Sequence, residues 1–167
     1  MADIYNKTIL ITGGCGFIGS HFIPYFLEKN KDYRVVNLDL VTYAGNLSNL
    51  LEVESNPRYE FIKGDICNLE LVGSIFSYYR IQGVINFAAE SHVDNSIKTP
   101  GVFIETNIKG AFTLMDVAYK YWFESPFVYK NKFKGCRFHQ ISTDEIYGSL
   151  PEFGLFTEET PYAPNSP

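Results

Sequence analysis

The stretch that decides the fold is Lys7-Thr-Ile-Leu-Ile-Thr-Gly-Gly-Cys-Gly-Phe-Ile-Gly19. Its first six residues are mostly apolar and β-branched, which predicts a buried strand over residues 7–12. Glycines follow at three-residue spacing, and the apolar positions from Gly16 to Asn30 then recur with a helical period. A strand, a glycine-rich turn and a helix in this order predict a site for the phosphates of a dinucleotide.

Three glycines of this turn are expected to have different tasks. One of Gly13, Gly16 and Gly19 allows the tight turn, one lets the backbone approach a pyrophosphate, and one lets helix and strand pack closely. The start of the following helix offers free N–H groups and a partial positive charge. We expect the amides of Phe17 and Ile18 to be the donors to the phosphates.

An acidic residue at the end of the second expected strand indicates which dinucleotide is bound. Asp39 lies 20 residues beyond Gly19, where a carboxylate accepts hydrogen bonds from the adenosine ribose hydroxyls. A carboxylate there repels a 2′-phosphate, so the predicted cofactor is NAD rather than NADP. A structural turn without any ligand is the alternative interpretation of the glycines.

Strands and helices alternate along the rest of the chain. This alternation predicts an α/β fold of the Rossmann type, a doubly wound parallel sheet with helices on both faces. We expect residues 1–167 to form one NAD-binding domain that ends in a surface loop over residues 151–167. Further strands are expected at residues 33–38, 59–62, 83–87 and 136–141, and helices at residues 47–54, 69–79 and 100–122.

Composition argues against several other classes of protein. The net charge is −5 and no Lys/Arg cluster follows one face, so we expect no nucleic-acid partner. No apolar run is long enough to span a membrane, and the predicted strand at residue 7 leaves no room for a signal peptide. Three cysteines without a CxxC pair predict neither a metal site nor a disulfide framework. We therefore expect a cytoplasmic protein.

Several reactive side chains have plainer interpretations. Cys15, inside the glycine turn, is expected to pack rather than to act as a nucleophile. His139 is expected to be packed within its strand. Tyr43 and Trp122 are expected to pack rather than to react.

Further motifs give the chain a family resemblance. Thr12-Gly-Gly-Cys-Gly-Phe-Ile-Gly19 resembles the extended short-chain dehydrogenase/reductase superfamily, and the other motifs resemble its dTDP-glucose 4,6-dehydratase family. These segments are Leu40-Val-Thr-Tyr-Ala-Gly-Asn46, Gly64-Asp-Ile-Cys67, Ala88-Ala-Glu-Ser-His-Val-Asp94, Phe103-Ile-Glu-Thr-Asn-Ile108, Ile141-Ser-Thr-Asp-Glu-Ile-Tyr-Gly148, Leu155-Phe-Thr-Glu158 and Tyr162-Ala-Pro164.

The resemblance implies a set of site residues. Thr143 would bind substrate, Asp144 would be the general acid and Glu145 the general base, whereas an isolated Asp-Glu pair is more often a loop cap. Glu90 and Ser91 would also contact substrate. The implied cofactor contacts are Gly13, Gly16, Phe17, Ile18, Gly19, Asp39, Leu40, Thr42, Asp65, Ile66, Phe87, Ala88, Ala89, Ser91 and Thr106.

The implied reaction is the NAD-dependent dehydration of dTDP-glucose to dTDP-4-keto-6-deoxyglucose by a homodimeric lyase. The family's catalytic Tyr-x-x-x-Lys pair would come just after Pro167. We therefore expect an N-terminal part, truncated before that helix, without the substrate-binding domain and inactive alone. The alternatives are an NAD-binding fragment without catalysis, or a related UDP-sugar dehydratase or epimerase; epimerases of the superfamily carry small hydroxyl residues where Asp144 and Glu145 stand.

Overall fold

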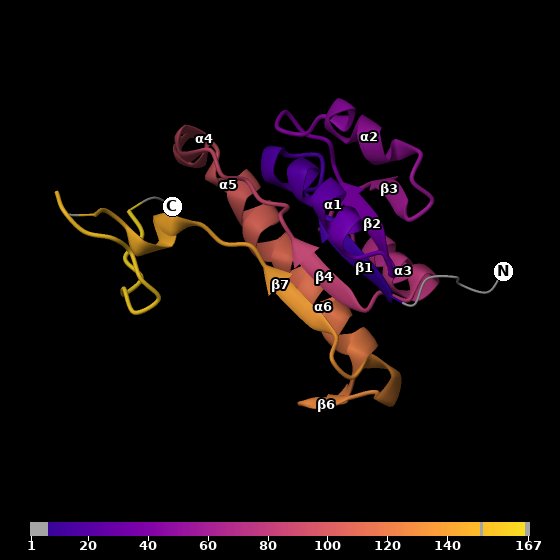
Figure 1. Ribbon diagram of the computed structural model, residues 1–167. Helices are drawn as coiled ribbons and strands as arrows, with labels where there is room; N and C mark the ends of the chain where they lie inside the picture. The colour runs from indigo at the N-terminus through magenta and orange to yellow at the C-terminus, as the bar shows by residue number, and fades with distance from the viewer. Residues whose placement is uncertain (1–6, 151, 166–167) are drawn as a thin grey trace.

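The apolar strand that opens the sequence lies at the centre of the sheet. The computed structural model describes residues 7–150 and 152–165, and Figure 1 shows a sheet with helices on both sides. All neighbouring strands of the five-stranded sheet are parallel, in the order β3-β2-β1-β4-β7. The strands are β1 (Lys7–Thr12), β2 (Tyr33–Asp39), β3 (Tyr59–Lys63), β4 (Gly83–Asn86) and β7 (Arg137–Gln140). The predicted doubly wound α/β fold is confirmed.

Helices cover the two faces of the sheet because β1 and β2 are apolar on both sides. Leu10 and Val36 face one cluster with α3 and α6, whereas Ile9 and Val35 face another with α1 and α2. The helical elements are α1 (Phe17–Lys29), η1 (Leu47–Leu50), α2 (Leu51–Glu54), α3 (Leu69–Tyr79), α4 (Val93–Lys98), α5 (Pro100–Phe103), η2 (Ile104–Gly110), α6 (Ala111–Trp122), η3 (Asn131–Phe133) and η4 (Asp144–Tyr147).

The first helix begins where the glycine turn ends. α1 starts at Phe17 and continues through Pro24, although a proline there supplies no N–H to the helical ladder. One side of α1 is buried against the sheet through Ile23 and Leu27. The N-terminus of the helix is thereby held beside the end of β1.

The long helix predicted at residues 100–122 is present, but it is not uniform. Its middle, η2, is a π-helical turn between α5 and α6. Such segments widen the helix locally and are frequent at functional sites. A short helix, α4, precedes it, and the antiparallel pair β5 (Phe123–Ser125) and β6 (Val128–Tyr129) follows it. Neither α4 nor this pair is predicted by the sequence pattern.

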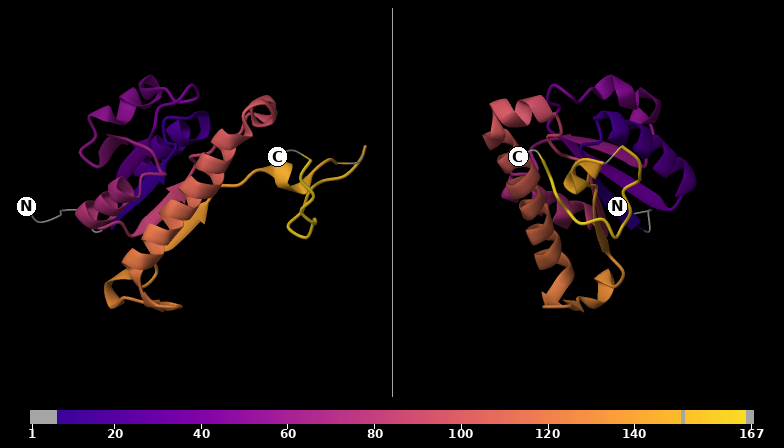
Figure 2. Two further views of the ribbon diagram at one scale, coloured as in Figure 1. Left: turned by 180° about the vertical axis from the view of Figure 1, so that it is seen from behind. Right: turned by 90° about the vertical axis from the view of Figure 1, so that its left-hand side faces the viewer.

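The last part of the chain leaves the sheet after β7. Figures 1 and 2 show this yellow segment extending away from the helices, with η4 near its start. Tyr147 holds it together through ring contacts with Phe156 and Tyr162. Residues 151, 166 and 167 of the predicted surface loop lie outside the described residues.

Candidate functional site

The candidate site lies at the carboxyl ends of the strands, where the order of the sheet reverses. The chain passes from β1 outward to β2 and β3, and then crosses to β4 on the other side of β1. Ligands of doubly wound sheets bind at this kind of switch point. A cavity opens there, and its lining is Gly13, Gly16, Leu38, Asp39, Leu40, Thr42, Ala44, Gly45, Gly64, Asp65, Ile66, Phe87, Ala88, Ala89, Glu90 and Thr106.

The glycines of the turn meet different constraints. Gly13 has a φ of +69°, and a Cβ there would lie 2.5 Å from the amide nitrogen of Ala88. A Cβ on Gly19 would lie 2.5 Å from the Gly13 carbonyl oxygen, so this position requires close packing of helix and turn. A Cβ on Gly16 would meet only that same oxygen, at 3.3 Å, and Gly16 lines the cavity. Its missing side chain therefore leaves room on the cavity side.

The Asp39 carboxylate is held in place by backbone amides at the end of β2. Its Oδ2 accepts a hydrogen bond from the Cys15 amide at 2.8 Å, and its Oδ1 accepts one from the Val41 amide at 2.7 Å. Each carboxylate oxygen keeps a lone pair for a further donor. Val41 adopts a φ of 56°, which is uncommon for a β-branched residue. The glycine turn and the loop after β2 are thus joined through one acidic side chain.

The Cys15 thiol beside this carboxylate is not suited to act as a nucleophile. Cys15 has no exposed surface, and the Asn37 amide contacts its sulfur at 3.7 Å. Burial, with the Asp39 charge as the next cause, raises the pKa of Cys15 to about 12. The thiol therefore stays protonated, and the interpretation of Cys15 as a packing residue is confirmed.

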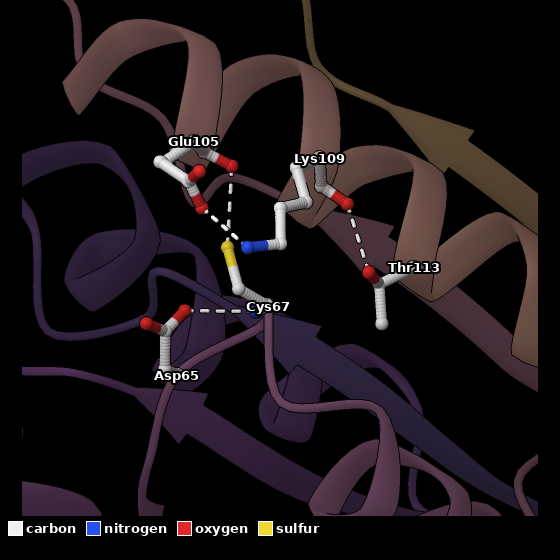
Figure 3. A network of polar contacts seen from close by, with 5 residues as sticks. All are labelled: Asp65, Cys67, Glu105, Lys109 and Thr113. Atoms are coloured by element: carbon white, nitrogen blue, oxygen red, sulfur yellow. Dashed lines mark hydrogen bonds and ion pairs between the residues drawn. The ribbon is translucent and has the colours of Figure 1, made fainter. Parts of the chain in front are cut away.

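The far wall of the cavity joins the loop after β3 to the long helix, as Figure 3 shows. Asp65 accepts a hydrogen bond from the Cys67 amide at 2.8 Å, and the Cys67 thiol donates to the Glu105 carbonyl oxygen at 3.2 Å. Lys109 and Glu105 form an ion pair on the same turn. Ile66 is buried beneath Gly110. The π-helical turn thus brings Thr106 to the same cavity as Asp65 and Ile66.

The loop after β4 forms the opposite wall. Phe87, Ala88 and Ala89 line the cavity directly after the strand ends, and Glu90 follows them. The Glu90 amide donates to the Asn107 side-chain oxygen, and the Asn107 amide donates to the Glu90 carbonyl, both at 2.8 Å. The helix that carries Thr106 therefore also fixes this loop.

Four predicted cofactor residues do not line the cavity. Phe17 and Ile18 are 80% and 62% exposed, as the first two residues of α1. Their amides belong to the group that a helix start leaves without intrahelical acceptors. Gly19 is buried behind the turn, and Ser91 is exposed beyond Glu90. A role in cofactor binding for these positions stays a prediction.

The predicted catalytic residues lie outside the cavity lining. Thr143, Asp144 and Glu145 follow β7 on the same edge of the sheet as the cavity, and all three are exposed. The Thr143 hydroxyl accepts a hydrogen bond from the Glu145 amide at 3.2 Å and caps η4. It also lies 3.3 Å from the Asp144 carboxylate. The local geometry is a cap, and the catalytic roles stay a prediction.

Sequence reasoning missed some residues of the site. Leu38, Ala44, Gly45 and Gly64 line the cavity without having been predicted. They flank the predicted residues Asp39, Thr42 and Asp65, so adjacency to them was the available signal.

A polar chain beneath the site was also missed. The Thr12 hydroxyl donates to the Asn86 side chain, whose amide donates to Gln140 at 2.7 Å. Thr12 and Asn86 are fully buried and Gln140 is exposed, so these bonds connect the ends of β1 and β4 in the interior to the end of β7 at the surface. Because β7 leads to Thr143, this chain ties the base of the cavity to the strand that precedes the predicted catalytic residues.

Comparison with known proteins agrees with this geometry. The protein family described as GDP-mannose 4,6 dehydratase matches residues 10–167. The chain belongs to this family. It is similar to the dTDP-glucose 4,6-dehydratase of Neisseria gonorrhoeae, with 49% identity over 163 residues, which is 97% of this chain and 46% of that protein. The predicted resemblance is thereby confirmed, and the chain spans less than half the length of that relative.

Solved structures give the same result. The dTDP-glucose 4,6-dehydratase of Bacillus anthracis, in complex with NAD, superposes with a TM-score of 0.79 and 42% identity, covering 96% of this chain and 45% of that one. The corresponding enzyme of Streptomyces venezuelae, also with NAD, gives a TM-score of 0.82 and 39% identity, covering 96% and 46%.

Two further observations concern other kinds of site. Within residues 7–150 and 152–165, no helix is long and apolar enough to cross a membrane. In the same part of the chain, no three His, Cys, Asp or Glu side chains are grouped so that they could hold a metal ion.

Proposed function

We propose that this chain binds NAD. The observation that carries the proposal is the position of Asp39. This residue is the last of β2, backbone amides fix its carboxylate, and it lines the cavity beside the glycine turn. A carboxylate in this position suits ribose hydroxyls and disfavours a 2′-phosphate. The open cavity side of Gly16 fits the close approach of a pyrophosphate. The solved relatives that hold NAD support the same conclusion.

For a protein that also carries the second half of its relatives, the proposed reaction is the dehydration of dTDP-glucose to dTDP-4-keto-6-deoxyglucose. Bound NAD⁺ would accept the hydride from C4 of the sugar, with the C4 hydroxyl proton passing to the tyrosine of the Tyr-x-x-x-Lys pair in that second half, and the reduced cofactor would return the hydride to C6. Asp144 protonates the departing C6 hydroxyl, and Glu145 removes the C5 proton that the 4-keto group acidifies. The Thr143 hydroxyl binds the sugar. Support comes from the family match and from the location of these residues on the cavity edge of the sheet.

The homodimer remains part of this proposal. Exposed apolar side chains follow one another at three- and four-residue intervals along η2 and α6, a spacing that places them on one side of a helix. They are Ile104, Ile108, Phe112, Met115 and Tyr119. An apolar stripe of this kind is typical of a helix that packs against another helix.

A second candidate is NAD binding without catalysis. The observation that favours it is the position of Thr143, Asp144 and Glu145, which lie outside the cavity lining and form a helix cap. The two candidates share the cofactor and differ in turnover, so one set of measurements separates them.

The proposal is tested with the purified 167-residue chain. Titration with NADH, followed by its fluorescence, is expected to show binding that is tighter than binding of NADPH. Incubation with NAD and dTDP-glucose is expected to give no keto sugar, measured by its absorbance in alkali. Equal affinity for NADPH would refute the assignment of NAD, and no binding of either nucleotide would refute the cofactor site. Turnover would instead refute the expectation that the chain is inactive alone.

A further inference from the structure

Tyr43 is an aromatic residue whose position differs from expectation. It was predicted to pack, but its side chain is 67% exposed. The residues on both sides of it, Thr42 and Ala44, line the cavity. Its hydroxyl donates a hydrogen bond to the Glu90 carboxylate at 2.9 Å. An exposed ring with a paired hydroxyl at the rim of a cavity requires an explanation other than core packing.

The acceptor of this hydrogen bond is held firmly from behind. The Glu90 backbone is clamped by the side-chain oxygen and nitrogen of Asn107, through two hydrogen bonds of 2.8 Å. Asn107 belongs to η2, next to the cavity residue Thr106. The Glu90 carboxylate is therefore presented to Tyr43 by a loop that cannot move freely away from the long helix.

The donor side is anchored as well. The loop that carries Tyr43 is bonded to Asp39 through the Val41 amide and to the Cys15 carbonyl through the Asn46 amide, at 2.7 and 3.0 Å. These contacts tie the loop to the glycine turn on both sides of Tyr43. Between these two contacts, the Gly45 amide donates to the Thr42 carbonyl at 3.0 Å, and the Tyr43 side chain reaches across the cavity to Glu90.

The hydrogen bond crosses the end of the central strand. β2 and β4 flank β1, so the loops that follow them are separated by two strand spacings, about 10 Å in total. Two long side chains, Tyr43 and Glu90, bridge this gap. The bridge passes over the strand end where Gly13 begins the turn, and it joins two walls of one cavity.

The geometry points to Tyr43 as a positioning residue of the cofactor site, whose hydrogen bond to Glu90 latches the two loops over the bound dinucleotide and slows its release. The inference rests on the proposed binding of NAD. It assigns Tyr43 no chemical step, because its hydroxyl holds a loop and exchanges no proton with substrate. The Glu90 carboxylate that accepts this bond also raises the pKa of Tyr43, so the hydroxyl remains a donor at neutral pH.

The test compares Tyr43→Phe, which removes only the hydroxyl, with Tyr78→Phe as the matched control. Tyr78 is 80% exposed and lies near the end of α3, away from the cavity lining. In the 167-residue chain, NADH is displaced by excess NAD in a stopped-flow instrument. Tyr43→Phe is expected to release NADH roughly threefold to tenfold faster, the range that the net strength of an ordinary protein hydrogen bond gives. Tyr78→Phe is expected to match the unaltered chain.

A second measurement needs no cofactor. Hydrogen exchange of the amides in residues 40–46 and 88–92 is expected to quicken in Tyr43→Phe and not in Tyr78→Phe, because the open state of the two loops becomes more populated. An unaltered NADH release rate in Tyr43→Phe would refute the latch whatever the exchange shows. If the unaltered chain binds no NADH, both the latch and the proposed function are refuted. If it binds NADH and only the variant's predicted changes are missing, the latch alone is refuted.

Discussion

Gly110→Ala tests the contact between the long helix and the wall of the cavity. A Cβ at Gly110 would lie 2.5 Å from Cδ1 and 2.6 Å from Cγ1 of Ile66, whereas ordinary contacts are 3.4–4 Å. Ile66 is buried, and it lines the cavity, so the cavity is the open space toward which it can move. Overpacking of this kind costs about 1–3 kcal/mol of stability. The gain in helix propensity from glycine to alanine is about 1 kcal/mol.

The matched control is Gly73→Ala in the middle of α3. No atom lies within 4 Å of a Cβ at Gly73, so this variant is expected to gain the full propensity of about 1 kcal/mol. The two alanine variants should therefore differ by about 1–3 kcal/mol, with Gly110→Ala the less stable.

The assay is urea unfolding followed by circular dichroism, combined with NADH titration. Gly110→Ala is expected to bind NADH more weakly because Ile66 is displaced into the site. If Gly110→Ala were as stable as Gly73→Ala, the helix would not lie against Ile66 as described.

Three further outcomes are expected. Asp39→Ala should narrow the preference for NAD over NADP in calorimetric titrations, and an unchanged ratio would contradict the role of this carboxylate. In a version of the protein that includes the second half of its relatives, Glu145→Gln should abolish deuterium exchange at C5 of the sugar in D₂O, and exchange at the normal rate would exclude Glu145 as the base. The stability that the protonated Cys15 thiol contributes should be fully present below about pH 9 and should be lost as the pH rises toward about 12. Burial raises the pKa of Cys15 to about 12 in the folded protein, so the unfolded thiol loses its proton first. Cys15→Ala should lose less stability over that interval, and an equal loss in urea unfolding would refute this assignment.

Much of the fold could be predicted because its signals are local. The β-branched run of residues 7–12, the glycine spacing and the position of Asp39 each constrain the backbone within a few residues. A strand that alternates with helices allows few topologies, since parallel strands need crossovers on the faces of the sheet. The burial of Cys15 follows from the same turn.

Other expectations failed because they depend on what covers a residue. His139 was predicted to be packed, but it is exposed in β7, which pairs with β4 on one side and forms an edge of the described sheet. Trp122 is buried as predicted, with its indole N–H bonded to the Ile81 carbonyl at 2.7 Å. Both side chains carry aromatic rings, so the sequence alone does not tell which of the two is buried. The elements that pack against each residue decide its burial.

The sequence by itself determined the parallel sheet, the glycine turn with its acidic partner, and most of the residues that line the cavity. Only the tertiary structure decided how the walls of that cavity are held together. The Asn107 clamp and the bond between Tyr43 and Glu90 join residues that are 17 and 47 positions apart. No periodicity or local propensity encodes such contacts, because they arise when the sheet brings the loops after β2 and β4 to one edge.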